Sequence, residues 1–208
     1  MKVYTLALGD MANCCYVVAE GNSCIVIDPA WDVSVIDNFL RDKNLIPEYV
    51  FFTHGHFDHT NNADKFLRPR RLKGYMEKGD EVVCQLPADI LEFYKGSQNF
   101  MWGKTLIAII HTPGHTRGSV CIKIENLLFT GDTLFIGSIG RTDMPGSDPA
   151  KMIKSLQNIA QLSPETIIYC GHSYGDNTGF SGTLKNEIEH NQFLSLAIKN
   201  PKQLEGLL

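Results

Sequence analysis

The chain has 208 residues, of which 43% are hydrophobic and 20% are charged, a profile typical of one globular domain with a sizeable core. We therefore expect residues 1–208 to form a single domain. Unbroken apolar runs such as Cys14–Ala19 and Leu106–Ile110 are far shorter than the roughly 18 residues that a membrane-spanning helix needs, so a membrane is not an expected partner. A net charge of −4 repels phosphate backbones, which makes nucleic acid an unexpected partner as well.

The cysteines and the start of the chain bear on its compartment. Six cysteines are scattered without a C-x-x-C pair, and a chain of this length does not need disulfides to fold, so we expect reduced thiols. Strand-like alternation begins at Val3, without the apolar core and cleavage site of a secretory signal. Together these features predict a cytoplasmic protein.

The first part of the chain predicts an antiparallel start followed by a helix. Alternating apolar residues indicate three short strands, at Val3–Leu8, Cys14–Ala19 and Cys24–Ile27. Pro29 ends the third strand, and apolar residues at helical spacing predict a helix over 33–43. The apolar, aromatic run Tyr49–Thr53 predicts a buried strand that leads directly into a polar block.

The second part predicts alternating strands and helices after an irregular stretch. Residues 75–103 lack clear periodicity and contain several glycines, so we expect loops and short helical turns there. Further strands are expected at Thr105–His111, Ser119–Ile124, Leu127–Thr130 and Thr166–Cys170. Asp148 and Pro149 are typical of a helix start, and the apolar stripe behind them ends at Ile159. A last helix is expected over Thr183–Lys199, which makes the whole an α/β domain.

The polar block, His54-Gly55-His56-Phe57-Asp58-His59, places four metal-binding side chains within six residues. His54 and His56 are two residues apart in extended chain, so both imidazoles point to the same side and can share one metal. Asp58 and His59 follow after the chain must turn, so they suit a second metal close to the first. The spacing therefore predicts two half-sites.

Three later positions can complete these half-sites. His115, Asp132 and His172 each follow a predicted strand and a glycine, which lets a short loop turn toward a shared pocket. Two histidines remain. His111 is either a residue that orients a ligand or a surface residue, and we interpret His190 as a surface residue of the last helix.

These residues carry a family resemblance. The H-x-H-x-D-H block together with His115, Asp132 and His172 resembles the metallo-β-lactamase superfamily from about residue 3 to residue 194. The resemblance implies an αββα sandwich, in which two mixed β-sheets face each other with helices on the outer faces. It also implies the ligand sets: His54, His56 and His115 for the first metal, Asp58, His59 and His172 for the second, and Asp132 bridging both.

Three segments narrow the resemblance: residues 130–135 (TGDTLF), 140–143 (GRTD) and 170–175 (CGHSYG). They are similar to the glyoxalase II-like, or hydroxyacylglutathione hydrolase-like, thioester hydrolases, in the compact form that lacks the C-terminal glutathione-binding helical domain. The GRTD segment also resembles that of the persulfide dioxygenases, which use a single iron. The true β-lactamases of the commonest zinc class have a cysteine where Asp132 stands, which disfavours antibiotic hydrolysis.

The resemblance implies two divalent metal ions, zinc foremost, with iron or manganese as alternatives. Two adjacent cations acidify a bridging water to hydroxide, which can attack the carbonyl carbon of a small-molecule thioester, and a thiolate with a pKa near 8.5 leaves readily. Asp132 would hold the metals at a fixed separation and Asp58 would offset the second cation, so both are expected to be catalytic. Arg141 can either clamp a substrate carboxylate or pair with Asp143.

Two further functions are less favoured. Nuclease branches of the superfamily carry additional segments for RNA, and the basic run at Arg68, Arg70, Arg71 and Lys73 is typical of a solvated face. A non-catalytic metal or redox-binding protein would not need the complete set of seven ligand positions. The sequence does not indicate an oligomeric state.

Overall fold

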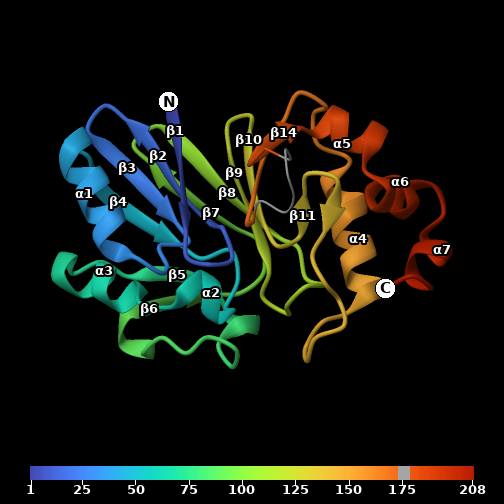
Figure 1. The fold of residues 1–208 in the computed structure, drawn as a ribbon, viewed down its shortest axis with the longest axis horizontal. Coiled ribbons are helices and arrows are strands. Elements are labelled where there is room, and N and C mark those ends of the chain that lie inside the picture. Colours follow the sequence, from blue (N-terminus) through green and yellow to red (C-terminus); the bar gives the residue numbers. More distant parts are fainter. Residues whose placement is uncertain (173–178) are drawn as a thin grey trace.

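The computed structural model describes residues 1–172 and 179–208 (Figure 1). Two six-stranded sheets face each other and helices cover their outer faces, so the predicted αββα sandwich with two mixed sheets is confirmed. Residues 173–175 of the CGHSYG segment lie outside the described residues.

The first sheet joins an antiparallel half to a parallel half. Its strands, in spatial order, are β1 (Lys2–Leu8), β2 (Asn13–Glu20), β3 (Ser23–Ile27), β4 (Ile46–Phe51), β5 (Gly74–Glu77) and β6 (Leu91–Tyr94). The pairs from β1 to β3 are antiparallel and those from β3 to β6 are parallel. Parallel neighbours need crossover connections, and α1 (Val33–Lys43) and α3 (Ala63–Arg70) provide two of them.

The second sheet is mostly antiparallel. Its strands, in spatial order, are β14 (Ser181–Thr183), β13 (Ile167–Cys170), β10 (Leu127–Gly131), β9 (Val120–Ile124), β8 (Thr105–His111) and β7 (Gln98–Trp102). The pair β10–β13 is parallel, and its crossover contains a two-stranded hairpin, β11 (Leu134–Phe135) with β12 (Ser138–Ile139), and helix α4 (Pro149–Ile159). Asp148 caps α4 by accepting the Lys151 N–H, as the sequence predicts.

Central strands such as β3 and β10 alternate their side chains between two apolar layers. In β3, Ile25 and Ile27 pack between the sheets, whereas Val26 packs with the helices outside the first sheet. In β10, Phe129 lies between the sheets and Leu128 faces the helices outside the second sheet. A side-chain period of two therefore builds both layers from one strand, which explains why these strands read as continuous apolar runs.

The expectation for residues 75–103 is partly wrong. Two short 3₁₀ turns are present, at Lys78–Asp80 and Ala88–Ile90, but β6, β7 and most of β5 also lie in this stretch. Strands of four or five residues are too short to show an alternating pattern. They are stabilised by distant partners, because β5 and β6 obtain their backbone hydrogen bonds from the first sheet and β7 from the second.

The polar block also contains structure that the sequence analysis did not predict. Residues Phe57–Thr60 form the one-turn helix α2, and α3 follows three residues later. The six cysteines are free, as expected. Within residues 1–172 and 179–208, every helix is too short or too polar to cross a membrane.

The expected last helix over Thr183–Lys199 is broken at Asn191. The observed helices are α5 (Leu184–His190), α6 (Gln192–Lys199) and α7 (Pro201–Glu205). The fully buried Asn191 side chain accepts the N–H groups of Phe193 and Leu194, and it donates to the carbonyls of Phe135 and Ser138. The break lets one side chain cap α6 and hold the β11–β12 hairpin at the same time.

We expect Asn191→Ala to lower the free energy of unfolding by about 3 kcal/mol, because it removes a helix cap and leaves buried carbonyls without a donor. Asn200→Ala is the matched control, since Asn200 caps α7 in an exposed position and its loss should cost about 1 kcal/mol or less. Urea denaturation measures both. Equal losses would show that Asn191 acts only as a helix cap.

Candidate metal centre

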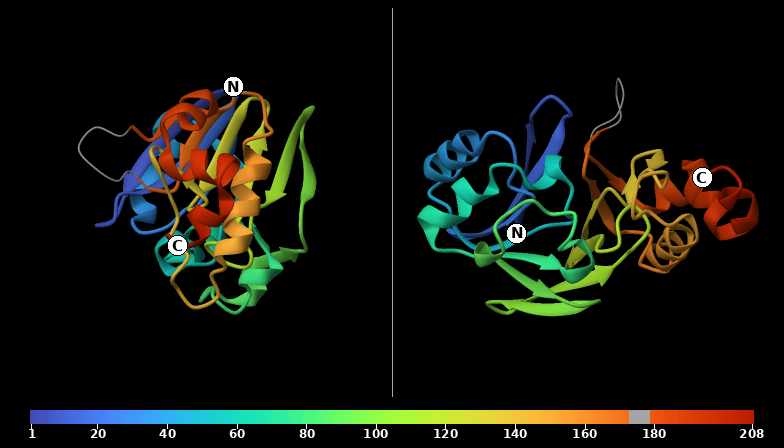
Figure 2. Two further views of the ribbon diagram at one scale, coloured as in Figure 1. Left: turned by 90° about the vertical axis from the view of Figure 1, so that its right-hand side faces the viewer. Right: turned by 90° about the horizontal axis from the view of Figure 1, so that it is seen from below.

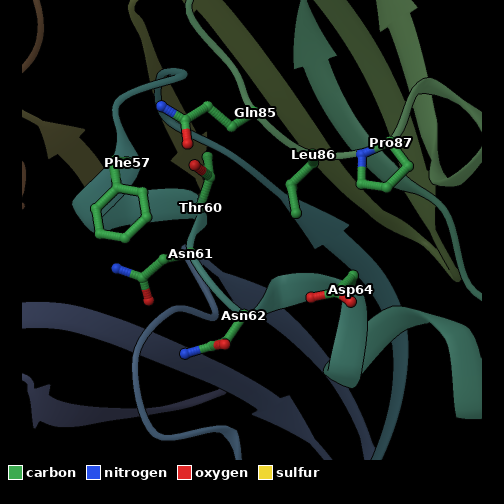
Figure 3. Close-up of a pocket in the computed structure, with 8 residues that line it drawn as sticks. All are labelled: Phe57, Thr60, Asn61, Asn62, Asp64, Gln85, Leu86 and Pro87. Carbon is green, nitrogen blue, oxygen red and sulfur yellow. The ribbon is translucent and has the colours of Figure 1, made fainter.

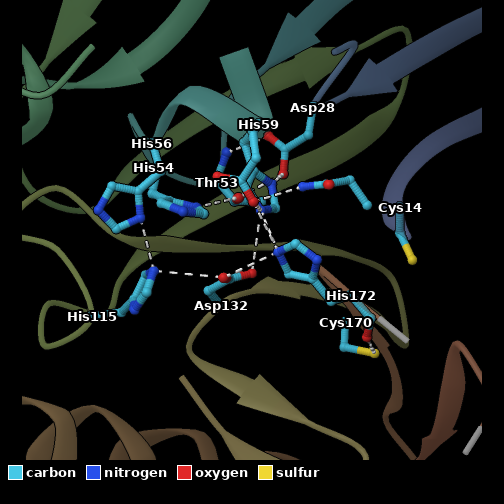
Figure 4. Close-up of polar contacts among 12 residues, drawn as sticks. Cys14, Asp28, Thr53, His54, His56, His59, His115, Asp132, Cys170 and His172 are labelled. Carbon is cyan, nitrogen blue, oxygen red and sulfur yellow. Dashed lines mark hydrogen bonds and ion pairs between the residues drawn. The ribbon is translucent and has the colours of Figure 1, made fainter. Parts of the chain in front are cut away.

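The seven side chains predicted as metal ligands meet at one edge of the sandwich, and Figure 4 labels all of them except Asp58. They come from four segments, each of which follows the carboxyl end of a strand: residues 54–59 after β4, His115 after β8, Asp132 after β10 and His172 after β13. Four chain segments that are distant in sequence therefore contribute to one site.

The first half-site consists of three imidazoles. One ligand atom from each of His54, His56 and His115 lies within 4.8 Å of the other two. His56 Nδ1 and His115 Nε2 are 3.0 Å apart, and the ring centroids of His54 and His56 are 4.8 Å apart. The structure thus brings together the set that the family resemblance assigns to the first metal.

The second half-site consists of Asp58, His59 and His172. Their ligand atoms also lie within 4.8 Å of one another. His59 Nε2 is 3.1 Å from His172 Nε2, and Asp58 Oδ2 is 3.2 Å from His172 Nε2. Asp58 and His59 reach this position from helix α2, which supplies the turn that the spacing predicted.

Asp132 lies between the two half-sites. Its Oδ2 is 3.5 Å from His115 Nε2 and 3.4 Å from His172 Nε2, and its Oδ1 is 3.4 Å from His59 Nε2. Gly171 makes this placement possible, because a Cβ at that position would lie 2.2 Å from Asp132 Oδ1. A single carboxylate therefore faces both half-sites.

Two buried atoms of the cluster lack a hydrogen-bond partner among the described residues, His54 Nε2 and Asp132 Oδ1. Buried polar atoms without a partner are uncommon, and both of these atoms can donate an electron pair to a cation. Imidazole nitrogens and carboxylate oxygens that converge at these distances are the donors that zinc, manganese and iron take from proteins. The residues present therefore fit bound divalent cations.

Electrostatics divides the imidazoles into two groups. Burial lowers the pKa of His54 and His56, which favours the neutral form that metals bind. Burial also acts against protonation of His59 and His172, but the nearby Asp132 carboxylate raises the pKa of both, that of His172 to about 9. A cation at the second half-site therefore competes with protons for these nitrogens.

The pKa values of the two carboxylates, Asp58 and Asp132, are lowered. Burial alone would raise the pKa of Asp58, but its hydrogen bonds with His172 and Asn13 and the charge of His59 hold it below the usual value. The same holds for Asp132, whose pKa is lowered by His59 and His172 despite burial. Both side chains are therefore anionic at neutral pH.

Asp28 supports the site and was missed by the sequence analysis. Its carboxylate accepts the N–H and the hydroxyl of Thr53 and lies 2.9 Å from His59 Nδ1, which aims His59 Nε2 at the second half-site. The available signal was its position, since Asp28 directly follows the apolar strand β3, just as Asp132 follows β10.

Asp80 joins the two segments that carry the first half-site. It is fully buried, and its carboxylate accepts the backbone N–H groups of Gly55 and Gly118 and the hydroxyl of Thr116, each at 2.7 Å. Gly55 separates His54 from His56, and Thr116 follows His115. No periodic or motif signal marks Asp80, because its partners are 25 to 38 residues away.

The remaining predicted residues lie as follows. Arg141 donates to both Asp143 carboxylate oxygens, at 2.9 and 3.0 Å, and it also lines the cleft over the cluster. His111 contacts the Arg117 carbonyl through Nε2, so it supports the loop that carries His115. His190 is exposed on α5, and its Nδ1 lies 3.0 Å from the Asn186 carbonyl of the same helix.

The basic run makes local contacts. Arg68 pairs with Asp89, Arg70 pairs with Asp37, and Lys73 donates to the Asp89 carbonyl. Half of the Arg68 side chain remains exposed, as expected for a solvated face.

The cleft above the cluster has a volume of about 310 Å³. It is lined by Met11, His56, Phe57, Asp58, His115, Asp132, Arg141, Met144 and His172. Met11 and Phe57 are large apolar side chains that are 50% and 56% exposed, so the entrance of a polar site has an apolar rim.

This fold, with a cluster of histidine and aspartate side chains at the sheet edge, is typical of a class of metal-dependent proteins. The family model of the metallo-beta-lactamase superfamily matches residues 8–172, so the chain belongs to this superfamily of metal-dependent hydrolases.

The more specific similarities are to hydrolases. A probable polyketide biosynthesis zinc-dependent hydrolase, PksB of Bacillus subtilis, is 32% identical over 187 residues, which are 88% of this chain and 82% of that relative. The hydroxyacylglutathione hydrolase of Psychromonas ingrahamii is 33% identical over 163 residues, 76% of this chain but 60% of that relative.

Two solved structures are also similar. The BLEG-1 B3 metallo-beta-lactamase superimposes with a TM-score of 0.82 at 28% identity, covering 93% of this chain and 100% of that one. A di-iron-bound form of TTHA1623 has a TM-score of 0.79 at 27% identity, covering 91% of this chain and 99% of that one.

We expect Asp80→Asn to lower the free energy of unfolding of the metal-free chain by about 3 kcal/mol, because an amide cannot accept all three hydrogen bonds at this buried position. The measurement is urea denaturation in the presence of a chelator. Asp89→Asn is the control, the same substitution at an exposed ion pair, and it should have little effect. If the two variants were equally stable, Asp80 would not hold the ligand loops together.

Proposed function

We propose that this protein is a binuclear metal-dependent hydrolase that cleaves thioesters. The observation that carries the proposal is the arrangement of two groups of three ligands around one carboxylate, Asp132. Two buried atoms that can bind a cation, His54 Nε2 and Asp132 Oδ1, also lack a hydrogen-bond partner among the described residues. The similarity to a hydroxyacylglutathione hydrolase supports a thioester as the substrate, and the di-iron form of a similar structure supports a site with two metal ions.

In this proposal His54, His56 and His115 hold one cation, and Asp58, His59 and His172 hold the other. Asp132, which faces both ligand groups, would bind both cations. When bound, two such cations supply an acidified water and stabilise negative charge on a carbonyl oxygen. Zinc is the first choice, since one relative is described as zinc-dependent, and manganese or iron suits the same donors.

The protein groups around the cleft supply orientation. Asp28, through Nδ1 of His59, and the Arg141 carbonyl, through Nδ1 of His115, fix the rings so that each Nε2 faces the cluster. Asn13 donates to Asp58 Oδ2 and holds that carboxylate in place. These contacts prepare the site before the substrate arrives.

The reaction is the addition of water across the bond between the carbonyl carbon and sulfur. The products are a carboxylate and a thiol, and the carbon–sulfur bond breaks as the thiolate leaves. Because thiols have pKa values near 8.5, the leaving group needs no strong general acid. The histidine rings that face the cluster are therefore free to hold cations. We propose a small-molecule thioester as the partner of this cleft.

We expect the zinc-loaded protein, incubated without oxygen, to hydrolyse a thioester such as S-lactoylglutathione and to release one thiol per carboxylate. Air should not change the rate. Asp132→Asn should lower kcat by about 10² or more, since it removes the bridging charge, whereas His190→Ala should leave kcat unchanged. Thiol release and acid formation are measured together.

Two results would replace this assignment. Activity only in an iron form, with oxygen consumed and sulfite formed from glutathione persulfide, would identify a persulfide dioxygenase. Turnover of a cephalosporin but of no thioester would identify a β-lactamase, in line with the similar B3 structure.

We expect the protein to bind two metal ions per chain after loading with excess zinc, and His172→Ala to bind one. His190→Ala is the matched control, a histidine removed away from the cluster, and it should retain two. Elemental analysis after gel filtration gives the stoichiometry. One ion per wild-type chain would contradict the binuclear centre.

We expect Arg141→Ala to raise KM for thioesters with an acidic acyl group by about tenfold and to change KM for neutral ones little, if Arg141 clamps a carboxylate. Asp143→Ala is the control, because it removes the same ion pair but retains the guanidinium. Equal effects of the two substitutions on both kinds of substrate would assign Arg141 to the ion pair alone.

A further inference from the structure

A second cavity lies beside the metal cleft. Its volume is about 330 Å³, and it is lined by Phe57, Thr60, Asn61, Asn62, Asp64, Gln85, Leu86 and Pro87 (Figure 3). Phe57 also lines the cleft over the cluster, so the two spaces share this side chain as a wall. A ligand that reacts at the cluster can extend past Phe57 into this cavity.

Asn61 forms part of the cavity and holds an unsatisfied donor. The residue is only 8% exposed, and its Oδ1 accepts the Trp31 N–H at 2.6 Å. Its Nδ2 is buried and has no acceptor within residues 1–172 and 179–208. A buried amide without its hydrogen bond costs about 1–3 kcal/mol, so a ligand carbonyl oxygen that reaches Asn61 Nδ2 would bind favourably.

The other walls combine amide groups with apolar surface. Asn62 donates its Nδ2 hydrogen to the Trp31 carbonyl, so its Oδ1 can accept a hydrogen bond from an N–H group of a ligand. The Gln85 side chain offers both a donor and an acceptor. Phe57 and Leu86 supply apolar contact on opposite sides (Figure 3). Such a lining suits a chain in which amide groups alternate with methylene groups.

The cavity is connected to the metal centre by hydrogen bonds. Trp31, which bonds Asn61 and Asn62, donates its indole N–H to Asn13 Oδ1 at 2.9 Å, and Asn13 donates to Asp58 Oδ2 at 2.9 Å. Trp31 and Asn62 both have left-handed backbone, with φ of 61° and 60°. Strained residues of this kind are concentrated at ligand sites.

We propose that this cavity is the subsite for the thiol-bearing arm of the substrate, and that the arm it takes is an uncharged chain with amide groups, of the pantetheine type. The inference rests on the proposed thioester hydrolysis. Asp64 carries a negative charge into the cavity, so an arm that ends in carboxylates, such as glutathione, binds less well. The acyl group then lies in the cleft between Met11 and Met144.

The test compares acetyl thioesters of three thiols: 2-mercaptoethanol, which has no amide, pantetheine and glutathione. In the wild-type protein, we expect kcat/KM for the pantetheine thioester to exceed that for the mercaptoethanol thioester at least tenfold, mainly through KM. Gln85→Ala should remove about fivefold of this advantage and leave the mercaptoethanol thioester unchanged. Gln98→Ala, the same change on the exposed strand β7, is the matched control.

Asp64→Asn tests the charge separately. It should raise kcat/KM for the glutathione thioester about threefold to tenfold and leave the pantetheine thioester unchanged. Equal kcat/KM values for the pantetheine and mercaptoethanol thioesters would overturn the subsite while the hydrolase function stands.

If no thioester is hydrolysed, the proposed function fails and binding decides the subsite. Isothermal titration with S-methylpantetheine, whose methylated sulfur cannot form a metal-binding thiolate, should then show binding that Gln85→Ala weakens about fivefold. No binding, or binding that Gln85→Ala does not weaken, would overturn the subsite.

Discussion

The structure depends on the convergence of two carboxylates and five imidazoles in one small volume at the sheet edge. Asp58 and Asp132 each lie 3.2–3.6 Å from at least two imidazole nitrogens. Burying so many polar groups is unfavourable unless each has a partner. The surrounding loops meet this demand with further buried groups, Asp28 behind His59 and Asp80 between the first-site loops, and with Gly171, which leaves space for the Asp132 carboxylate.

The sandwich makes this convergence possible because its apolar layers provide the stability, while the polar ligands lie at the strand ends. Three apolar layers, one between the sheets and one under each set of helices, stabilise the strands. The strand ends can then carry polar side chains and residues with unusual backbone, such as Asp28 and Gly131 with φ of 52° and 48°. Asn191 adds a similar link, because it joins α6 to the hairpin that follows Asp132.

The site and the neighbouring cavity form one chemical environment. The cleft over the cluster is rimmed by Met11 and Phe57, and the cavity behind Phe57 is lined by amides. The hydrogen bonds from Asn61 through Trp31 and Asn13 to Asp58 connect the two. An arrangement of this kind can bind the two arms of a substrate on either side of the bond that is cleaved, which is how an enzyme orients a reacting group.

The sequence by itself determined an α/β domain and the polar block, because a side-chain period of two, helix caps and ligand spacing are local properties of the chain. The αββα sandwich was implied only by the family resemblance of the ligand residues. It also placed His115, Asp132 and His172 after strands, where the structure has them. Only the tertiary structure decided the supporting roles of Asp28 and Asp80, the short strands β5, β6 and β7, the break at Asn191 and the cavity beside Phe57. Each of these depends on contacts between residues distant in sequence, such as Asp80 with Gly118 or Asp28 with His59, and such contacts leave no pattern in the local sequence.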